Sequence, residues 1–166
     1  MFFVLSFFGI AQDDENPVVW ETNVKQISDT DYELIVKGQI FEGWHLYSQF
    51  TSEGGSLPSE FNYKELGKDY QLVGESQESK TMTEFSDIFE IDETFFKEEA
   101  IFTQQIKILN TDVSQIKVNL FYQVCKEVCI PADIDFVFSL NGEPVVNETV
   151  VIDDRSKELS AGLKLD

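Results

Sequence analysis

Both cysteines of this 166-residue chain stand close together, at Cys125 and Cys129. Two thiols separated by three residues can form a disulfide, exchange it with another protein, or bind a soft metal ion. A disulfide across so small a ring stabilises the fold only modestly, by about 2 kcal/mol in the loop-closure model against about 3 kcal/mol for a fifteen-residue loop. The spacing therefore favours a redox-active pair, with a stapling disulfide and a metal site as the alternatives.

The residues leading to Cys125 have the clearest strand pattern in the chain. Between residues 115 and 125, Ile116 and Val124 fall with the other apolar residues on one face, and Cys125 falls on the opposite face. We therefore expect Cys125 to point away from the main core or to lie under a covering loop. Three intervening residues suit a tight hairpin with the cysteines opposite each other, because cross-strand Cβ atoms lie about 4.5–5.5 Å apart.

His45 is the only histidine, and it stands in an aromatic segment between Trp44 and Tyr47. Packing among these aromatic neighbours is the simplest interpretation. A proton transfer to a cysteine thiolate is the functional alternative. A site for copper(I) or zinc formed with the two cysteines is another alternative, but no second histidine or methionine cluster supports it, so we expect no metal and no other cofactor.

Phe85 lies in a polar stretch, residues 77–92, that has no clean period and is expected to be a long irregular excursion. Such segments in compact domains are often functional. A phenylalanine between Glu84 and Ser86 suits a cap that covers a reactive site and opens for a partner. A core position for Phe85 is the alternative.

About eight short strands must position these groups. The abundance of Phe, Tyr, Val, Ile and Thr favours sheet over helix, and short strands separated by turn residues are typical of an all-β sandwich or barrel. Gly38 falls inside the second strand and is expected to mark a bulge. In chain order, we expect strands at residues 18–26, 32–41, 42–48, 69–74, 100–109, 115–125 and 133–140, and the segment 61–67 is ambiguous.

The length of the chain limits the number of domains, and its charge limits the kinds of partner that it can bind. The chain is long enough for one domain, expected at residues 13–152, followed by a charged tail at 153–166. Its net charge of −19 gives no basic footprint for nucleic acid or anionic membranes. The apolar segment 1–12 is too short to span a bilayer and resembles a secretory signal, with a buried first strand as the alternative. We therefore expect an exported protein that is not inserted in a membrane.

Three sequence blocks, in this order, resemble the N-terminal periplasmic domain of the thiol:disulfide interchange protein DsbD. The first is Glu42-Gly43-Trp44-His45-Leu46-Tyr47-Ser48, and the second is Thr83-Glu84-Phe85-Ser86-Asp87. The third combines Tyr122-Gln123-Val124-Cys125, Cys129-Ile130-Pro131 and the strand at 135–140. The resemblance covers about residues 17–141.

The resemblance implies an immunoglobulin-like β-sandwich in the periplasm. Its pair, Cys125 and Cys129, would accept electrons from a membrane-embedded thiol reductase and pass them to thioredoxin-like proteins of disulfide isomerisation or cytochrome c maturation. By the same resemblance, Cys129 would form the mixed disulfide. The residues that would line or cap the pair are Trp44, His45, Tyr47, Glu84 and Phe85. The alternatives are a non-catalytic secreted binding module with a structural disulfide, and a Cys/His protein that handles metal ions.

Overall fold

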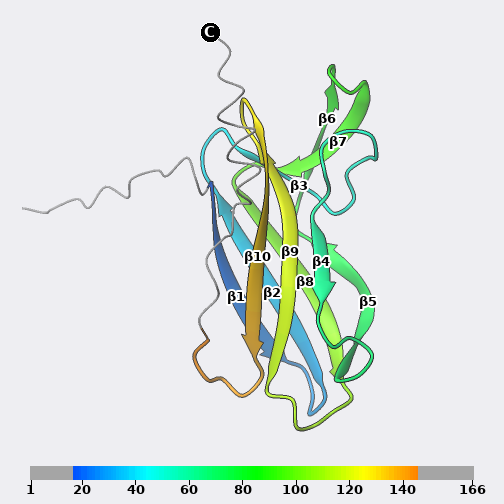
Figure 1. Ribbon diagram of the computed structural model, residues 1–166, viewed down its shortest axis with the longest axis vertical. Helices are drawn as coiled ribbons and strands as arrows, with labels where there is room; N and C mark the ends of the chain where they lie inside the picture. Colours follow the sequence, from blue (N-terminus) through cyan, green and yellow to red (C-terminus); the bar gives the residue numbers. More distant parts are fainter. Residues whose placement is uncertain (1–16, 146–166) are drawn as a thin grey trace, which may run out of the picture.

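The computed structural model describes residues 17–145, which form ten strands in two antiparallel sheets (Figure 1). The segments 1–12 and 153–166, expected to be a signal and a tail, lie outside the described residues. Within the described range, no helix has the length and apolar character needed to cross a membrane. The sheets pack face to face, which confirms the all-β sandwich.

The two sheets differ in size. The first has the order β1-β2-β8-β5, with β1 at Val18–Gln26, β2 at Asp31–Ile40, β8 at Glu99–Ile108 and β5 at Tyr70–Glu78. The second has the order β10-β9-β3-β7-β6, and β4 also pairs with β9. Its strands are β3 at His45–Tyr47, β4 at Glu60–Tyr63, β6 at Met82–Ser86, β7 at Ile91–Phe96, β9 at Gln115–Cys125 and β10 at Cys129–Ser139.

The core lies between the sheets and follows the period-two pattern of the strands. In β9, the alternate residues from Ile116 to Val124 are at most 2% exposed, as the sequence predicts. Trp20 of β1 packs edge-on against Tyr122 and Phe136 of the other sheet, with ring centroids 5.1 and 5.9 Å apart. Such contacts between inward-facing side chains hold the two sheets together.

Gly38 does not mark a bulge, contrary to the sequence prediction. It pairs regularly with Trp20 on one side and with Ala100 on the other. A Cβ at this position would lie 2.8 Å from Trp20 Cζ3 and 2.9 Å from Val18 Cγ1. The glycine is therefore explained by the close approach of the Trp20 ring to the backbone of β2.

We expect Gly38→Ala to lower the free energy of unfolding by about 1–3 kcal/mol, because the added methyl group overpacks against Trp20. The measurement is urea denaturation. In a Trp20→Leu background the cost of Gly38→Ala should decrease, since the clash with the ring is gone and only the close contact with Val18 Cγ1 remains. An equal cost in both backgrounds would contradict the explanation.

Residues 77–92 are mostly regular structure, so the expected irregular excursion is wrong. β5 continues to Glu78, and β6 pairs with β7 in a hairpin whose turn is closed by a hydrogen bond from the Glu90 N–H to the Ser86 carbonyl, 2.7 Å long. Every residue of β6 except Ser86 is exposed. A strand exposed on both faces need not alternate apolar and polar residues, so its sequence has no clear period.

Candidate active site

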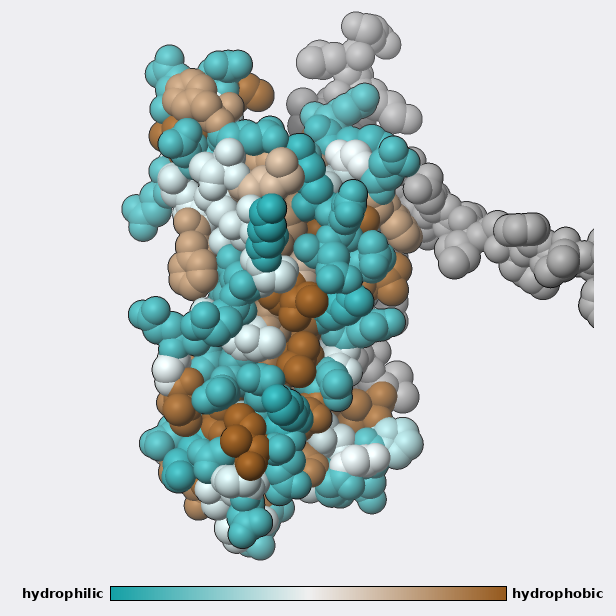
Figure 2. All heavy atoms as spheres, turned by 180° about the vertical axis from the view of Figure 1, so that it is seen from behind, coloured by the Kyte–Doolittle hydropathy of each residue, from teal (hydrophilic) through white to brown (hydrophobic). Residues whose placement is uncertain are grey.

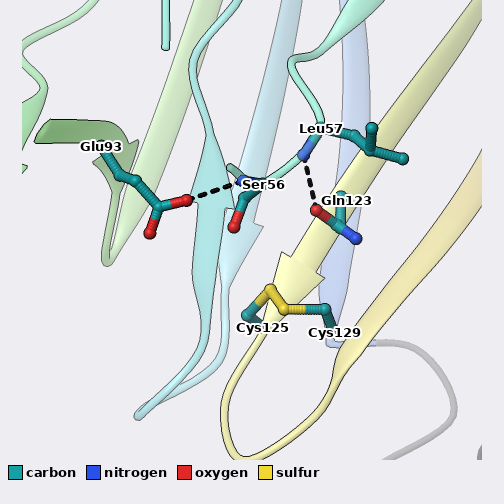
Figure 3. The surroundings of a disulfide bond; sticks show 6 residues. All are labelled: Ser56, Leu57, Glu93, Gln123, Cys125 and Cys129. Atoms are coloured by element: carbon teal, nitrogen blue, oxygen red, sulfur yellow. Dashed lines mark hydrogen bonds between the residues drawn. A yellow bond between two sulfur atoms is a disulfide. The ribbon is translucent and has the colours of Figure 1, made fainter. Parts of the chain in front are cut away.

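Cys125 and Cys129 form a disulfide at one end of the sandwich (Figure 3). Cys125 ends β9, Cys129 begins β10, and the two residues stand opposite each other with Cα atoms 4.1 Å apart. The hairpin is closed by a hydrogen bond from the Lys126 N–H to the Val128 carbonyl, 3.1 Å long. The cross-strand arrangement inferred from the three-residue spacing is therefore present.

The two cysteines differ in their access to solvent. Cys125 is only 6% exposed and forms a small buried cluster with Tyr47 and Phe95, separate from the main core that contains Val124. Cys129 is exposed. Cys125 is thus off the core face and covered, as its position in the strand indicates, while the sulfur-bearing residue open to a partner is Cys129.

His45 stands opposite Cys125 in the pairing of β3 with β9. Its ring stacks on Phe95, with centroids 4.3 Å apart and planes 15° from parallel. Burial lowers the pKa of His45, and the positive charge of Lys97 lowers it further, against weaker opposite effects of Glu84 and Glu93. The imidazole is therefore neutral at pH 7, packed beside the disulfide.

The lowered pKa predicts a pH-dependent stability. Between the folded pKa of His45 and the unfolded value of about 6.5, the unfolded chain binds more protons. The free energy of unfolding should therefore decrease as the pH falls from 7.5 to 5.5. His45→Gln, compared by urea denaturation across this range, should remove most of that decrease. The same slope in both proteins would show that His45 does not cause it.

Glu84 is connected to the cluster through Lys97. The Lys97 ammonium lies 3.1 Å from Glu84 Oε1 and 5.5 Å from the centre of the Phe95 ring. Glu84 also stands opposite Glu93 in the β6–β7 pairing, two residues from the Met82–Phe95 pair. Alternation along β6 therefore directs Glu84 to the same face as Phe95.

Phe85 and Trp44 lie differently from Glu84. Phe85 is 62% exposed and, one residue on from Glu84 and opposite Asp92, is directed to the other face of the hairpin. On the reverse side of the molecule, apolar residues gather at the free end of this hairpin (Figure 2): Phe85, Ile88 and Phe89. Trp44, just before β3, is buried in the main core together with Leu46 of β3. It therefore lies on the core face of the sheet, away from the disulfide.

Sequence reasoning missed several residues of the site. Phe95 of β7 stacks on His45, and Lys97, just after β7, pairs with Glu84. Their position depends on the pairing of strands far apart in the chain. Gln123 could have been identified, because it shares the parity of Cys125 in β9. The others are Ser56 and Leu57, in the connection between β3 and β4, and Glu93 of β7, which accepts a hydrogen bond from Ser56.

A metal site finds no support in the geometry. Among the described residues, no three His, Cys, Asp or Glu side chains are grouped so that they could hold a metal ion. Because Cys125 and Cys129 are joined, His45 is the one member of the proposed Cys₂His set with a free donor atom. The arrangement at this end of the sandwich is that of a disulfide with one accessible and one covered partner.

Comparisons with known proteins agree with this geometry. Residues 15–141 match the family model described as thiol:disulfide interchange protein DsbD, N-terminal. A search of curated proteins found no match. Among solved structures, the N-terminal periplasmic domain of ScsB from Proteus mirabilis is similar at a TM-score of 0.58 and 21% identity, over 92% of this chain and 56% of that chain.

Two further solved structures come from Neisseria meningitidis. The DsbD N-terminal domain in the reduced form is similar at a TM-score of 0.54 and 22% identity, over 84% of this chain and 96% of that chain. The complex between the DsbD N-terminal and PilB N-terminal domains is similar at a TM-score of 0.51 and 21% identity, over 85% and 96% of the two chains. These likenesses show the immunoglobulin-like sandwich fold. Because the family match extends over both sheets and includes Cys125 and Cys129, the chain belongs to the family of DsbD N-terminal domains.

Proposed function

We propose that Cys125 and Cys129 are a redox-active pair that undergoes thiol–disulfide exchange with protein partners. The observation that carries the proposal is the unequal access to the disulfide, with Cys129 exposed at the start of β10 and Cys125 only 6% exposed. An accessible sulfur is needed for attack by a partner, and a covered second sulfur is protected from side reactions. Membership of the DsbD N-terminal family supports the same chemistry.

The exchange proceeds in two displacements in each direction. A donor thiolate attacks Cys129 Sγ, the bond between the two sulfurs breaks, and its electron pair leaves on Cys125 Sγ, which takes up a proton. The second donor thiolate then displaces Cys129 and leaves the donor as a disulfide. The pair has gained two electrons and two protons. In the reverse sense, the Cys129 thiolate attacks an acceptor disulfide and the Cys125 thiolate resolves the mixed disulfide.

We further propose the partners and the place of this exchange. The donor is a membrane-embedded thiol reductase, and the acceptors are periplasmic thioredoxin-like proteins of disulfide isomerisation or cytochrome c maturation. Support comes from the family, whose model describes an interchange protein, and from the Neisseria DsbD N-terminal domain, which was solved in complex with the PilB N-terminal domain. The strongly acidic composition is compatible with a partner that is basic around its cysteines.

The proposal is tested by labelling thiols of the purified protein with a maleimide that adds a resolvable mass. In air, neither cysteine should be labelled; after incubation with a reduced thioredoxin, both should be. The double variant Cys125→Ser/Cys129→Ser is the control for labelling elsewhere. Free thiols in air, or a disulfide that a reduced thioredoxin leaves intact, would contradict a redox role.

Phe85 stays a predicted cap. Since Phe85 is 62% exposed here, that role requires the β6–β7 hairpin to move towards Cys129. A cap restricts small reagents, so Phe85→Ala should increase severalfold the rate at which dithiothreitol reduces the disulfide. Ile88→Ala, at an even more exposed position of the same hairpin, is the matched control. Equal reduction rates for wild type and both variants would show that Phe85 does not cap the disulfide.

A further inference from the structure

Residues 48–59 connect β3 to β4, and Ser56 and Leu57 of this connection lie near the disulfide (Figure 3). The Leu57 N–H donates a hydrogen bond of 2.7 Å to Gln123 Oε1 on β9. The Ser56 N–H donates one of 2.7 Å to Glu93 Oε1 on β7. Because β3 lies between β9 and β7, these two consecutive residues are tied to the strands on both sides of β3. We call residues 55–57 the strap.

The strap is fitted closely to the sheet. A Cβ on Gly55 would lie 2.7 Å from Glu93 Oε1 and 2.9 Å from Ile91 Cδ1, so a larger residue would require these two side chains to shift. Ser56 is 6% exposed and Glu93 is 7% exposed. A buried carboxylate that accepts a backbone N–H makes a strong, directional bond, and losing it would leave a charged group unpaired. The strap is therefore held in one position.

Tyr47 of β3 is in contact with the strap and with the residues that follow it. The Ser59 hydroxyl, just beyond the strap, donates to the Tyr47 carbonyl at 2.7 Å, and Tyr47 itself is 5% exposed. Burial raises the pKa of Tyr47, and an interaction with the Ser56 side chain opposes that effect. Tyr47 and Phe95 pack edge to face, with centroids 6.0 Å apart, and together they bury Cys125. The strap thus contacts Tyr47, one of the two rings that cover Cys125, while Cys129 stays exposed.

We propose that Gln123 and Glu93 are positioning residues that decide which sulfur of the disulfide reacts. By holding the strap across β3, they keep Tyr47 and Phe95 over Cys125. An incoming thiolate then reaches Cys129 Sγ, and the electron pair of the broken bond leaves on Cys125 Sγ. The choice between the two sulfurs matters in the cell only if the proposed exchange takes place, so in that respect this inference rests on the proposed function. The shielding of Cys125, however, should apply to any small reagent that attacks or labels thiols.

The test compares alkylation of single-cysteine proteins, which needs no protein partner. Cys125→Ser leaves the thiol of Cys129, and Cys129→Ser leaves that of Cys125; iodoacetamide should react much faster with the former. Adding Gln123→Leu should raise the rate at Cys125 by about tenfold, the effect of losing one hydrogen bond on local opening, and leave the rate at Cys129 unchanged. Gln123→Glu, which keeps the acceptor, should restore protection.

A second variant and a matched control separate shielding from a general loss of stability. Gly55→Ala displaces the strap from Glu93 and should also expose Cys125. Asn119→Leu removes a hydrogen bond to Asp135 from the same strand, away from the strap, and should change neither rate. Unchanged alkylation of Cys125 in both Gln123→Leu and Gly55→Ala, at native urea midpoints, would overturn the proposal. Failure of exchange with a thioredoxin, with these rates as expected, would overturn only the proposed function.

Discussion

Cys129→Ser is expected to abolish disulfide exchange with a thioredoxin-like protein, a loss of at least about a hundredfold in rate, because the accessible sulfur is gone. Cys125→Ser is expected to lose turnover as well, but for a different reason. It keeps the exposed Cys129 thiol and lacks the residue that resolves the mixed disulfide. A covalent complex should therefore accumulate with Cys125→Ser and be absent with Cys129→Ser.

The measurement is non-reducing electrophoresis and peptide mapping after each variant is mixed with a thioredoxin that keeps only its accessible cysteine, joined in a mixed disulfide to thionitrobenzoate, which leaves as the thiolate when a protein thiolate attacks. Wild type is the control for complete exchange, and the double serine variant is the control for non-covalent binding. A complex trapped through Cys125 in the Cys129→Ser variant would reverse the assignment of the two sulfurs. Equal behaviour of the two single variants would contradict the role given to unequal exposure.

The double serine variant also tests the rival role of the disulfide as a staple. The small ring should contribute only about 2 kcal/mol to the free energy of unfolding. A purely structural disulfide would predict that partner binding survives this modest loss and that exchange never occurs. The redox role predicts that the exchange disappears while the fold persists.

Leu46→Ala is expected to destabilise the fold by about 3–4 kcal/mol, through lost burial and a cavity in the core. Leu46 is completely buried at the middle of the three-residue strand β3, where it pairs with Val124 of β9 and with Phe96 of β7. The same short strand carries His45 and Tyr47 to the site. Loosening β3 should therefore also increase alkylation of Cys125 in a Cys129→Ser background.

Urea denaturation measures the stability, and Leu66→Ala is the matched control because Leu66 is 47% exposed. That control should change the free energy of unfolding by no more than about 0.5 kcal/mol. Comparable effects of the two substitutions would contradict the central position of β3. A large loss of stability without any change at Cys125 would separate the fold from the shielding of the site.

Much of the sandwich can be predicted from the sequence, because burial of one face gives each strand a period of two in its apolar residues. The long strands β1, β2, β8, β9 and β10 carry this period and lie close to where the sequence predicts them. The β6–β7 hairpin escaped prediction because β6 is exposed and has no such period. The predicted bulge at Gly38 is wrong, since a lone glycine in a strand does not show which side chain approaches it.

The sequence by itself determined two features of the site: the cysteines have three residues between them, and Cys125 lies off the core face of its strand. Local spacing and strand parity are enough for both conclusions, because they involve neighbouring residues. Only the tertiary structure decided how the pair is covered. The pairing of β3 with β9 and β7, and the hydrogen bonds from residues 56 and 57 to Glu93 and Gln123, join segments far apart in the chain. No local pattern encodes such pairings, because they depend on how strands distant in the sequence align in one sheet.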